Sequence, residues 1–137
     1  MPRISRFYFS MAILYLLAGI GVGLNMAVSQ DHSAASAHAH INLLGWVTSA
    51  VFGGYYALNP EKAEGWLPWS QYAVYALGLI VMLPSLYLLY SGRPEIEPLV
   101  AAGSLAVVLG VVLFAVVIFT RGRPETAAGG DAILPAE

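Results

Sequence analysis

Residues 36–46 have the sequence SAHAHINLLGW. They place His38, His40 and Asn42 at the start of an apolar run that continues to Leu58, and they contain two of the three histidines in the chain. Burying an ionisable side chain in a membrane-length segment costs free energy, so such a residue usually has a function. Neutral imidazole is a common ligand for haem iron, copper and zinc, and we therefore interpret this stretch as a candidate cofactor or metal site within a bilayer.

The composition is that of a membrane protein. Of the 137 residues, 58% are hydrophobic and 10% are charged, whereas a soluble domain carries about 25% charged residues. The net charge is only -2 and the basic residues are scattered, which argues against nucleic acid as a partner. The lack of cysteine excludes disulfides, iron–sulfur clusters and covalent c-type haem, so any haem would be bound non-covalently.

The apolar runs on either side of the histidines predict an all-α membrane protein with four transmembrane helices in an up-down bundle. Each run is close to the ~20 residues that a bilayer-spanning helix needs. The spans are expected at about residues 7–29, 38–58, 69–90 and 98–119. Together they form one transmembrane domain, residues 1–122, and residues 123–137 are expected to be a disordered tail.

The first apolar run is expected to be retained rather than cleaved as a signal peptide, because it is longer than the ~7–15 apolar residues of such a peptide. Small residues recur along it at every fourth position, at Gly19, Gly23 and Ala27. A stripe of this kind lets a neighbouring helix approach closely.

The basic residues predict the orientation in the membrane. Five of them fall near the two termini or in the 59–68 loop, and only Arg93 falls on the opposite side. By the positive-inside rule both termini are cytoplasmic, in a multi-pass protein of the cytoplasmic (inner) membrane. The histidine cluster, His32, His38 and His40, is then expected towards the external side.

His38 and His40 point to faces of a helix that are about 200° apart, so one helix cannot present both to the same metal ion. The stripe through His38 is small and polar and suits a bundle interior; it continues through Asn42, Gly45, Ser49, Gly53 and Tyr56. The stripe through His40 is apolar and suits lipid, a second protomer or a porphyrin; it continues through Leu43, Leu44, Val47, Val51, Gly54 and Leu58. The periodicity leaves the choice of ligand open. In a plainer interpretation, both histidines sit at the membrane interface and bond to headgroups or loop carbonyls.

Residues 7–60 resemble the first two helices of subunit I of the haem–copper oxidase superfamily, which includes the nitric oxide reductases. The likeness lies in His40-Ile41-Asn42-Leu43-Leu44 and in Tyr55-Tyr56 followed by Pro60-Glu61. The chain is also similar to short stand-alone, four-helix relatives of that subunit that carry His-Ala-His and then Asn-Leu-Leu-Gly-Trp. Matching the Asn-Leu-Leu selects His40 as the counterpart of the family's haem ligand, whereas counting back from the paired tyrosines selects His38.

The resemblance implies a haem b site with His40 or His38 as the axial iron ligand. Asn42 would hydrogen-bond a ligand or a haem propionate, and Trp46 and Tyr55 would pack the pocket. A full oxidase has more spans and more ligand histidines, so complete oxidase activity is not expected from this chain alone.

Haem iron takes one or two axial ligands, so the partner of this histidine is expected to be the other histidine of a second protomer, His32, a methionine such as Met26 or Met82, or no residue at all. A homodimer or a larger homo-oligomer would supply it by symmetry.

Three functional hypotheses follow. The first is a haem b protein related to cytochrome oxidase subunit I that acts in electron transport, haem handling or sensing. The second is a copper or other metal-binding assembly factor that uses the three imidazoles of His32, His38 and His40. The third is a cofactor-free accessory subunit that packs against respiratory-chain proteins.

Overall fold

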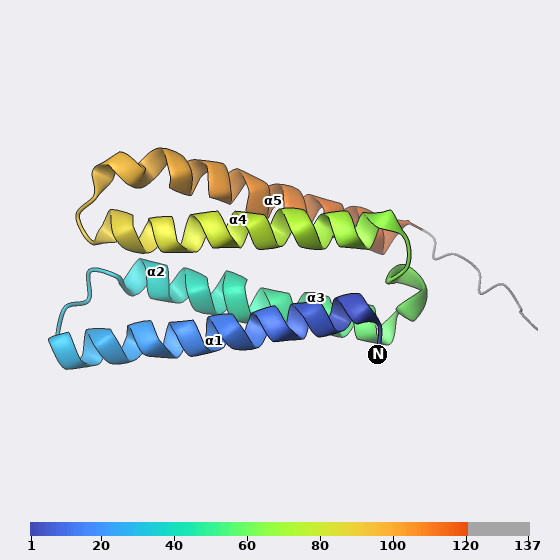
Figure 1. Ribbon diagram of the computed structural model, residues 1–137, viewed down its shortest axis with the longest axis horizontal. Helices are drawn as coiled ribbons and strands as arrows, with labels where there is room; N and C mark the ends of the chain where they lie inside the picture. The colour runs from blue at the N-terminus through green and yellow to red at the C-terminus, as the bar shows by residue number, and fades with distance from the viewer. Residues whose placement is uncertain (121–137) are drawn as a thin grey trace, which may run out of the picture.

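The computed structural model describes residues 1–120, and the regular elements in that range are all helices (Figure 1). The expected tail at 123–137 and the last two residues of the expected domain lie outside the described residues. The long elements are α1 (Arg3–Ser29), α2 (Ala35–His40), η1 (Ile41–Thr48), α3 (Ser49–Leu58), α4 (Trp66–Tyr90) and α5 (Glu97–Phe119). Two short 3-10 turns, η2 (Pro60–Lys62) and η3 (Pro94–Ile96), lie in the connections.

The helices form two antiparallel hairpins that lie side by side (Figure 1). One hairpin pairs α1 with the continuous segment α2–η1–α3, and the other pairs α4 with α5. The N-terminus, the connection between the hairpins and the end of α5 lie at one end of the molecule, and the two hairpin turns lie at the other (Figure 1). The all-α class and the up-down order of the segments are therefore as expected.

Within residues 1–120, three helices are long and apolar enough to cross a membrane: Arg3–Ser29, Trp66–Tyr90 and Pro94–Phe119. Their apolar side chains point outward in large numbers; Leu14 of α1 is 68% exposed and Leu105 of α5 is 72% exposed. An outward apolar surface of this kind is what a lipid bilayer covers. The expected second span differs from the other three, because it is built from three consecutive helical pieces.

α4 and α5 approach so closely that their contact requires glycine. A Cβ atom added at Gly103 would lie 2.6 Å from the backbone nitrogen of Met82, and one added at Gly78 would lie 2.7 Å from that of Val107. Both obstacles are backbone atoms, so a larger residue would force the two helices apart.

Gly103→Val is therefore expected to lower the free energy of unfolding by about 1–3 kcal/mol, the usual effect of overpacking a contact. Unfolding can be followed by circular dichroism in detergent with increasing denaturant. Gly54→Val is the matched control, because a Cβ atom at Gly54 meets nothing within 4 Å. Equal stability of the two variants would contradict the close contact of α4 and α5.

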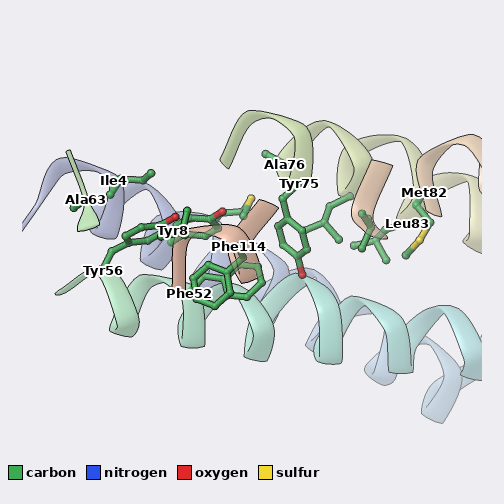
Figure 2. Packing of buried hydrophobic residues seen from close by; sticks show 14 of the residues in the cluster. Ile4, Tyr8, Phe52, Tyr56, Ala63, Tyr75, Ala76, Met82, Leu83 and Phe114 are labelled. Atoms are coloured by element: carbon green, nitrogen blue, oxygen red, sulfur yellow. The ribbon is translucent and has the colours of Figure 1, made fainter. Parts of the chain in front are cut away.

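The core where the hairpins meet is aromatic (Figure 2). Tyr8 of α1 packs edge-on against Phe52 of α3 at a ring-centroid distance of 5.6 Å, and Phe52 lies 4.0 Å from Phe114 of α5. The hydroxyls of Tyr8 and Tyr56 both donate to the side-chain oxygen of Gln71, at 2.5 and 3.2 Å. The Gln71 amide donates in turn to the carbonyl of Gly110 at 3.3 Å, so one buried side chain joins four helices.

Lys62 links the connection between the hairpins to the end of α5 by hydrogen bonds. Its ammonium donates to the carbonyls of Val117 and Ile118 at 3.1 and 3.2 Å, and also to that of Thr120. A cation at a helix C-terminus satisfies carbonyls that have no partner within the helix and complements the helix dipole. This contact holds one end of the bundle together.

Candidate functional site at the histidines

The histidines stand directly before a π-helical segment, η1. Two side-chain hydroxyls form hydrogen bonds that span five residues, the spacing of a π-helix. Thr48 donates to the carbonyl of Leu43 at 2.8 Å, and Ser49 donates to that of Leu44 at 3.4 Å. The Leu44 carbonyl also accepts from the Tyr75 hydroxyl of α4 at 2.9 Å, and Figure 2 shows Tyr75 reaching toward this segment. Local π-helical geometry is uncommon and is frequent at functional sites.

His38 faces α1. Its Nδ1 lies 2.9 Å from the carbonyl oxygen of Gly19, and a Cβ atom added at Gly23 would lie 3.0 Å from its Cε1. A carbonyl can only accept, so Nδ1 carries the proton. The imidazole thus lies between α2 and α1, against the small-residue stripe of α1.

Asn42 lies one turn after His38 and belongs to the same contact. Its amide donates to the His38 carbonyl at 2.9 Å, and its nitrogen is 3.4 Å from His38 Nδ1. A Cβ atom added at Gly19 would lie 2.6 Å from the Asn42 oxygen, so this glycine makes room for the amide. His38 and Asn42 therefore act together to join α2 and η1 to α1.

His40 has a different environment. Its side chain is exposed, and its Nδ1 lies 2.8 Å from the Ser36 carbonyl, one helical turn earlier. Nδ1 therefore carries the proton, and the lone pair of Nε2 remains available on the outer face. The apolar stripe that continues from His40 is also largely exposed, with Leu43 at 61%, Val47 at 40% and Val51 at 59%. The two faces predicted from the periodicity are thus the inner and outer faces of the hairpin.

The remaining predicted site residues do not join these two histidines in one group. His32 is exposed in the α1–α2 connection, with its Nδ1 3.3 Å from the Gln30 carbonyl. Trp46 is 36% exposed on η1. Tyr55 lies on α3, where its ring packs 5.1 Å from that of Phe114, in the aromatic core rather than at the histidines. Within residues 1–120 no group of three or more His, Cys, Asp or Glu side chains is arranged to hold a metal ion.

Two positioning residues are absent from the predicted site. Tyr75 fixes the first half of the π-helical segment through the Leu44 carbonyl, and Tyr15 packs against Gly45, where an added Cβ atom would lie 2.6 Å from its ring. Gly45 was part of the predicted interior stripe, but nothing in the sequence identifies which tyrosine fills the space beside it.

Comparison of the chain with protein-family models, with curated proteins and with solved structures gives no match. A histidine whose Nδ1 is held by a backbone carbonyl is the usual form of a metal-ligating imidazole, because that bond fixes the tautomer and the ring orientation. All three histidines meet this condition, His38 and His40 with the shorter contacts of 2.9 and 2.8 Å and His32 at 3.3 Å. His32 and His40 both present their rings away from the protein interior, and of these two only His40 lies on a helix at the head of an apolar stripe.

Proposed function

We propose that this chain is a haem b protein of the cytoplasmic membrane, in which His40 is an axial ligand of the haem iron. The observation that carries the proposal is the anchored and outward-facing imidazole of His40 at the head of an exposed apolar stripe. The bond from Nδ1–H to the Ser36 carbonyl holds the ring and raises the basicity of Nε2. Leu43 and Val47 provide the apolar surface that a porphyrin face requires.

His38 serves this site indirectly. Its ring packs against Gly19 and Gly23 of α1, and the Asn42 amide donates to its backbone carbonyl. It is a positioning residue that fixes α2, the helix on which His40 lies, against α1. The oxidase resemblance allowed two alignments, one that selects His40 through the Asn-Leu-Leu motif and one that selects His38 through the paired tyrosines. This arrangement favours the alignment that selects His40.

One chain provides only half of the proposed haem site. His40 lies on an exposed helix face, so a haem bound there needs a second wall. A second copy related by two-fold symmetry supplies both that wall and the second axial imidazole, which is its own His40. Bound haem would contribute a one-electron redox centre, in keeping with electron transfer, haem handling or sensing.

The proposed topology has four crossings. The segment α2–η1–α3 runs without interruption from Ala35 to Leu58, about 35 Å at ~1.5 Å per residue, which is enough to cross the hydrocarbon core. The excess of Lys and Arg at the end that carries the N-terminus favours a cytoplasmic location for that end. The histidines then lie towards the external side.

The copper alternative requires His32, His38 and His40 to converge, and the geometry of residues 1–120 offers no such cluster. A cofactor-free accessory subunit would be favoured by a protein that binds no haem in the following test.

The test is an oxidised-minus-reduced visible spectrum of protein purified from haem-replete cells, with a pyridine haemochrome assay to count haem. We expect sharp reduced bands of haem b and one haem for every two chains, with the protein migrating as a dimer. Absence of a Soret band, both as purified and after titration with haemin, would refute the proposed function. One haem per monomeric chain would leave haem binding in place and refute the shared site.

A further inference from the structure

Two cavities lie end to end between α1 and α4, at the end of the bundle that carries the histidines. Tyr87 of α4 lines both of them. On α1 the first cavity ends at Val22 and the second begins at Asn25, one helical turn later. The second cavity reaches the α1–α2 connection and the α4–α5 turn, which lie at the same end of the molecule (Figure 1). The two spaces therefore adjoin at Tyr87, and together we call them the α1–α4 groove.

The first cavity is apolar and has a volume of about 380 Å³. Its walls come from α1, η1 and α4 and include Ala18, Val22, Ile41, Leu83 and Leu88. Pro84 also lines it, in the middle of α4. With no charged or amide side chain in its lining, this space suits a hydrocarbon chain.

The second cavity is polar and has a volume of about 350 Å³. Its lining supplies an amide and hydroxyls from Asn25, Ser33, Tyr90 and Ser91, and one charged group, the carboxylate of Asp31. The backbone N–H of Ser33 donates to this carboxylate at 2.9 Å and lowers the pKa of Asp31, so the group is ionised at neutral pH. A carboxylate with no basic residue in the same lining favours a cationic ligand group.

A ligand that fits both spaces has a polar head with a positive charge next to an apolar chain. We propose that this groove binds one aminophospholipid of the surrounding bilayer, with its ammonium group at Asp31 and one acyl chain between Val22 and Leu83. The hydroxyls of Ser33 and Tyr90 and the Asn25 amide are the donors available to its phosphate. The assignment does not depend on haem binding, because none of the histidines lines either cavity.

The experiment is native mass spectrometry of the full chain, released from nanodiscs that contain equal amounts of phosphatidylethanolamine and phosphatidylglycerol. We expect one retained lipid per chain, with phosphatidylethanolamine favoured about tenfold, as ~1.4 kcal/mol of charge complementarity would give. Asp31→Asn is expected to remove the preference, whereas Glu95→Gln, a charge removed from the neighbouring turn outside the lining, should leave it unchanged.

A second pair of variants tests the apolar cavity. Val22→Trp fills it and is expected to abolish retention of either lipid, whereas Val28→Trp, on an exposed position of the same helix, is not. Equal retention of the two lipids by the wild-type chain would overturn the proposal, as would an unchanged preference in Asp31→Asn. Retention of a quinone or another neutral amphiphile in place of the lipid would also overturn it. Since Asp31 is exposed in a connection, its variant is expected to fold and decides the outcome even if Val22→Trp does not.

Discussion

Replacement of Gln71 by leucine is expected to lower the free energy of unfolding by about 2–4 kcal/mol, because it leaves buried hydroxyls without an acceptor. Gln71 is fully buried, and its oxygen is shared by the hydroxyls of Tyr8 and Tyr56. Its amide group also serves the Gly110 carbonyl. One substitution therefore removes partners on α1, α3 and α5 at once.

The cause of this loss can be separated from a packing defect. In the triple variant Tyr8→Phe/Tyr56→Phe/Gln71→Leu the unsatisfied hydroxyls are gone as well, and replacing all partners by apolar groups can be nearly neutral. We expect the triple variant to be more stable than Gln71→Leu alone, measured by denaturant unfolding in one detergent. A triple variant whose loss equals the sum of the single losses would contradict the explanation by hydrogen bonding.

The helical segments were predictable because each is a long apolar run closed by a polar turn or by proline. The first begins earlier than expected, at Arg3 rather than at residue 7, and the third begins at Trp66 rather than at residue 69. In both helices the added first turn contains polar residues or proline. These residues are tolerated there because the backbone N–H groups of a first turn have no partner within the helix. Hydropathy does not detect such a turn, since it registers only the apolar part of a helix.

The buried polar contacts were not predictable in the same way. Periodicity assigns a residue to a face, but it does not name the side chain opposite. Tyr8 and Gln71 are 63 positions apart in the chain, and only the packing of α1 against α4 brings them within 2.5 Å. The same limit applies to Tyr75, whose partner is a backbone carbonyl of η1.

At the candidate site, the 100° rotation per residue separated His38 from His40 correctly but could not choose between them. Gly19 and Gly23 accept the imidazole of His38 on α1 and leave His40 outside, and the proposal of His40 as the ligand rests on this difference. The π-helical segment after His40 had no sequence signal, because its residues are as apolar as those of an ordinary span. Tyr55 was predicted to pack the pocket through the family resemblance, yet its ring lies in the aromatic core with Phe114.

His40→Ala is expected to reduce haem occupancy at least tenfold, because it removes the imidazole proposed as the ligand. His38→Ala is expected to retain haem b but to lower the free energy of unfolding by about 1 kcal/mol, the usual contribution of one hydrogen bond, since its Nδ1 binds the Gly19 carbonyl. Pyridine haemochrome titration measures the first effect, and denaturant unfolding of the haem-free protein measures the second. His32→Ala, in an exposed connection, is the control for both.

Under the proposed geometry, His40→Ala loses haem and keeps its stability, whereas His38→Ala keeps haem and loses stability. This contrast tests the geometry more sharply than either variant alone. If His38 were the ligand, its ring would have to leave the surface of Gly19 and Gly23, and Asn42 would lose its place in the contact. In that case His38→Ala would lose haem and His40→Ala would keep it. Among residues 1–120 the hydrogen bond of the His40 ring stays within its own helix, at the Ser36 carbonyl, so removal of this ring is expected to leave the haem-free stability unchanged. Loss of haem without loss of stability in His40→Ala, combined with the reverse in His38→Ala, would assign the ligand to His40 and the positioning role to His38.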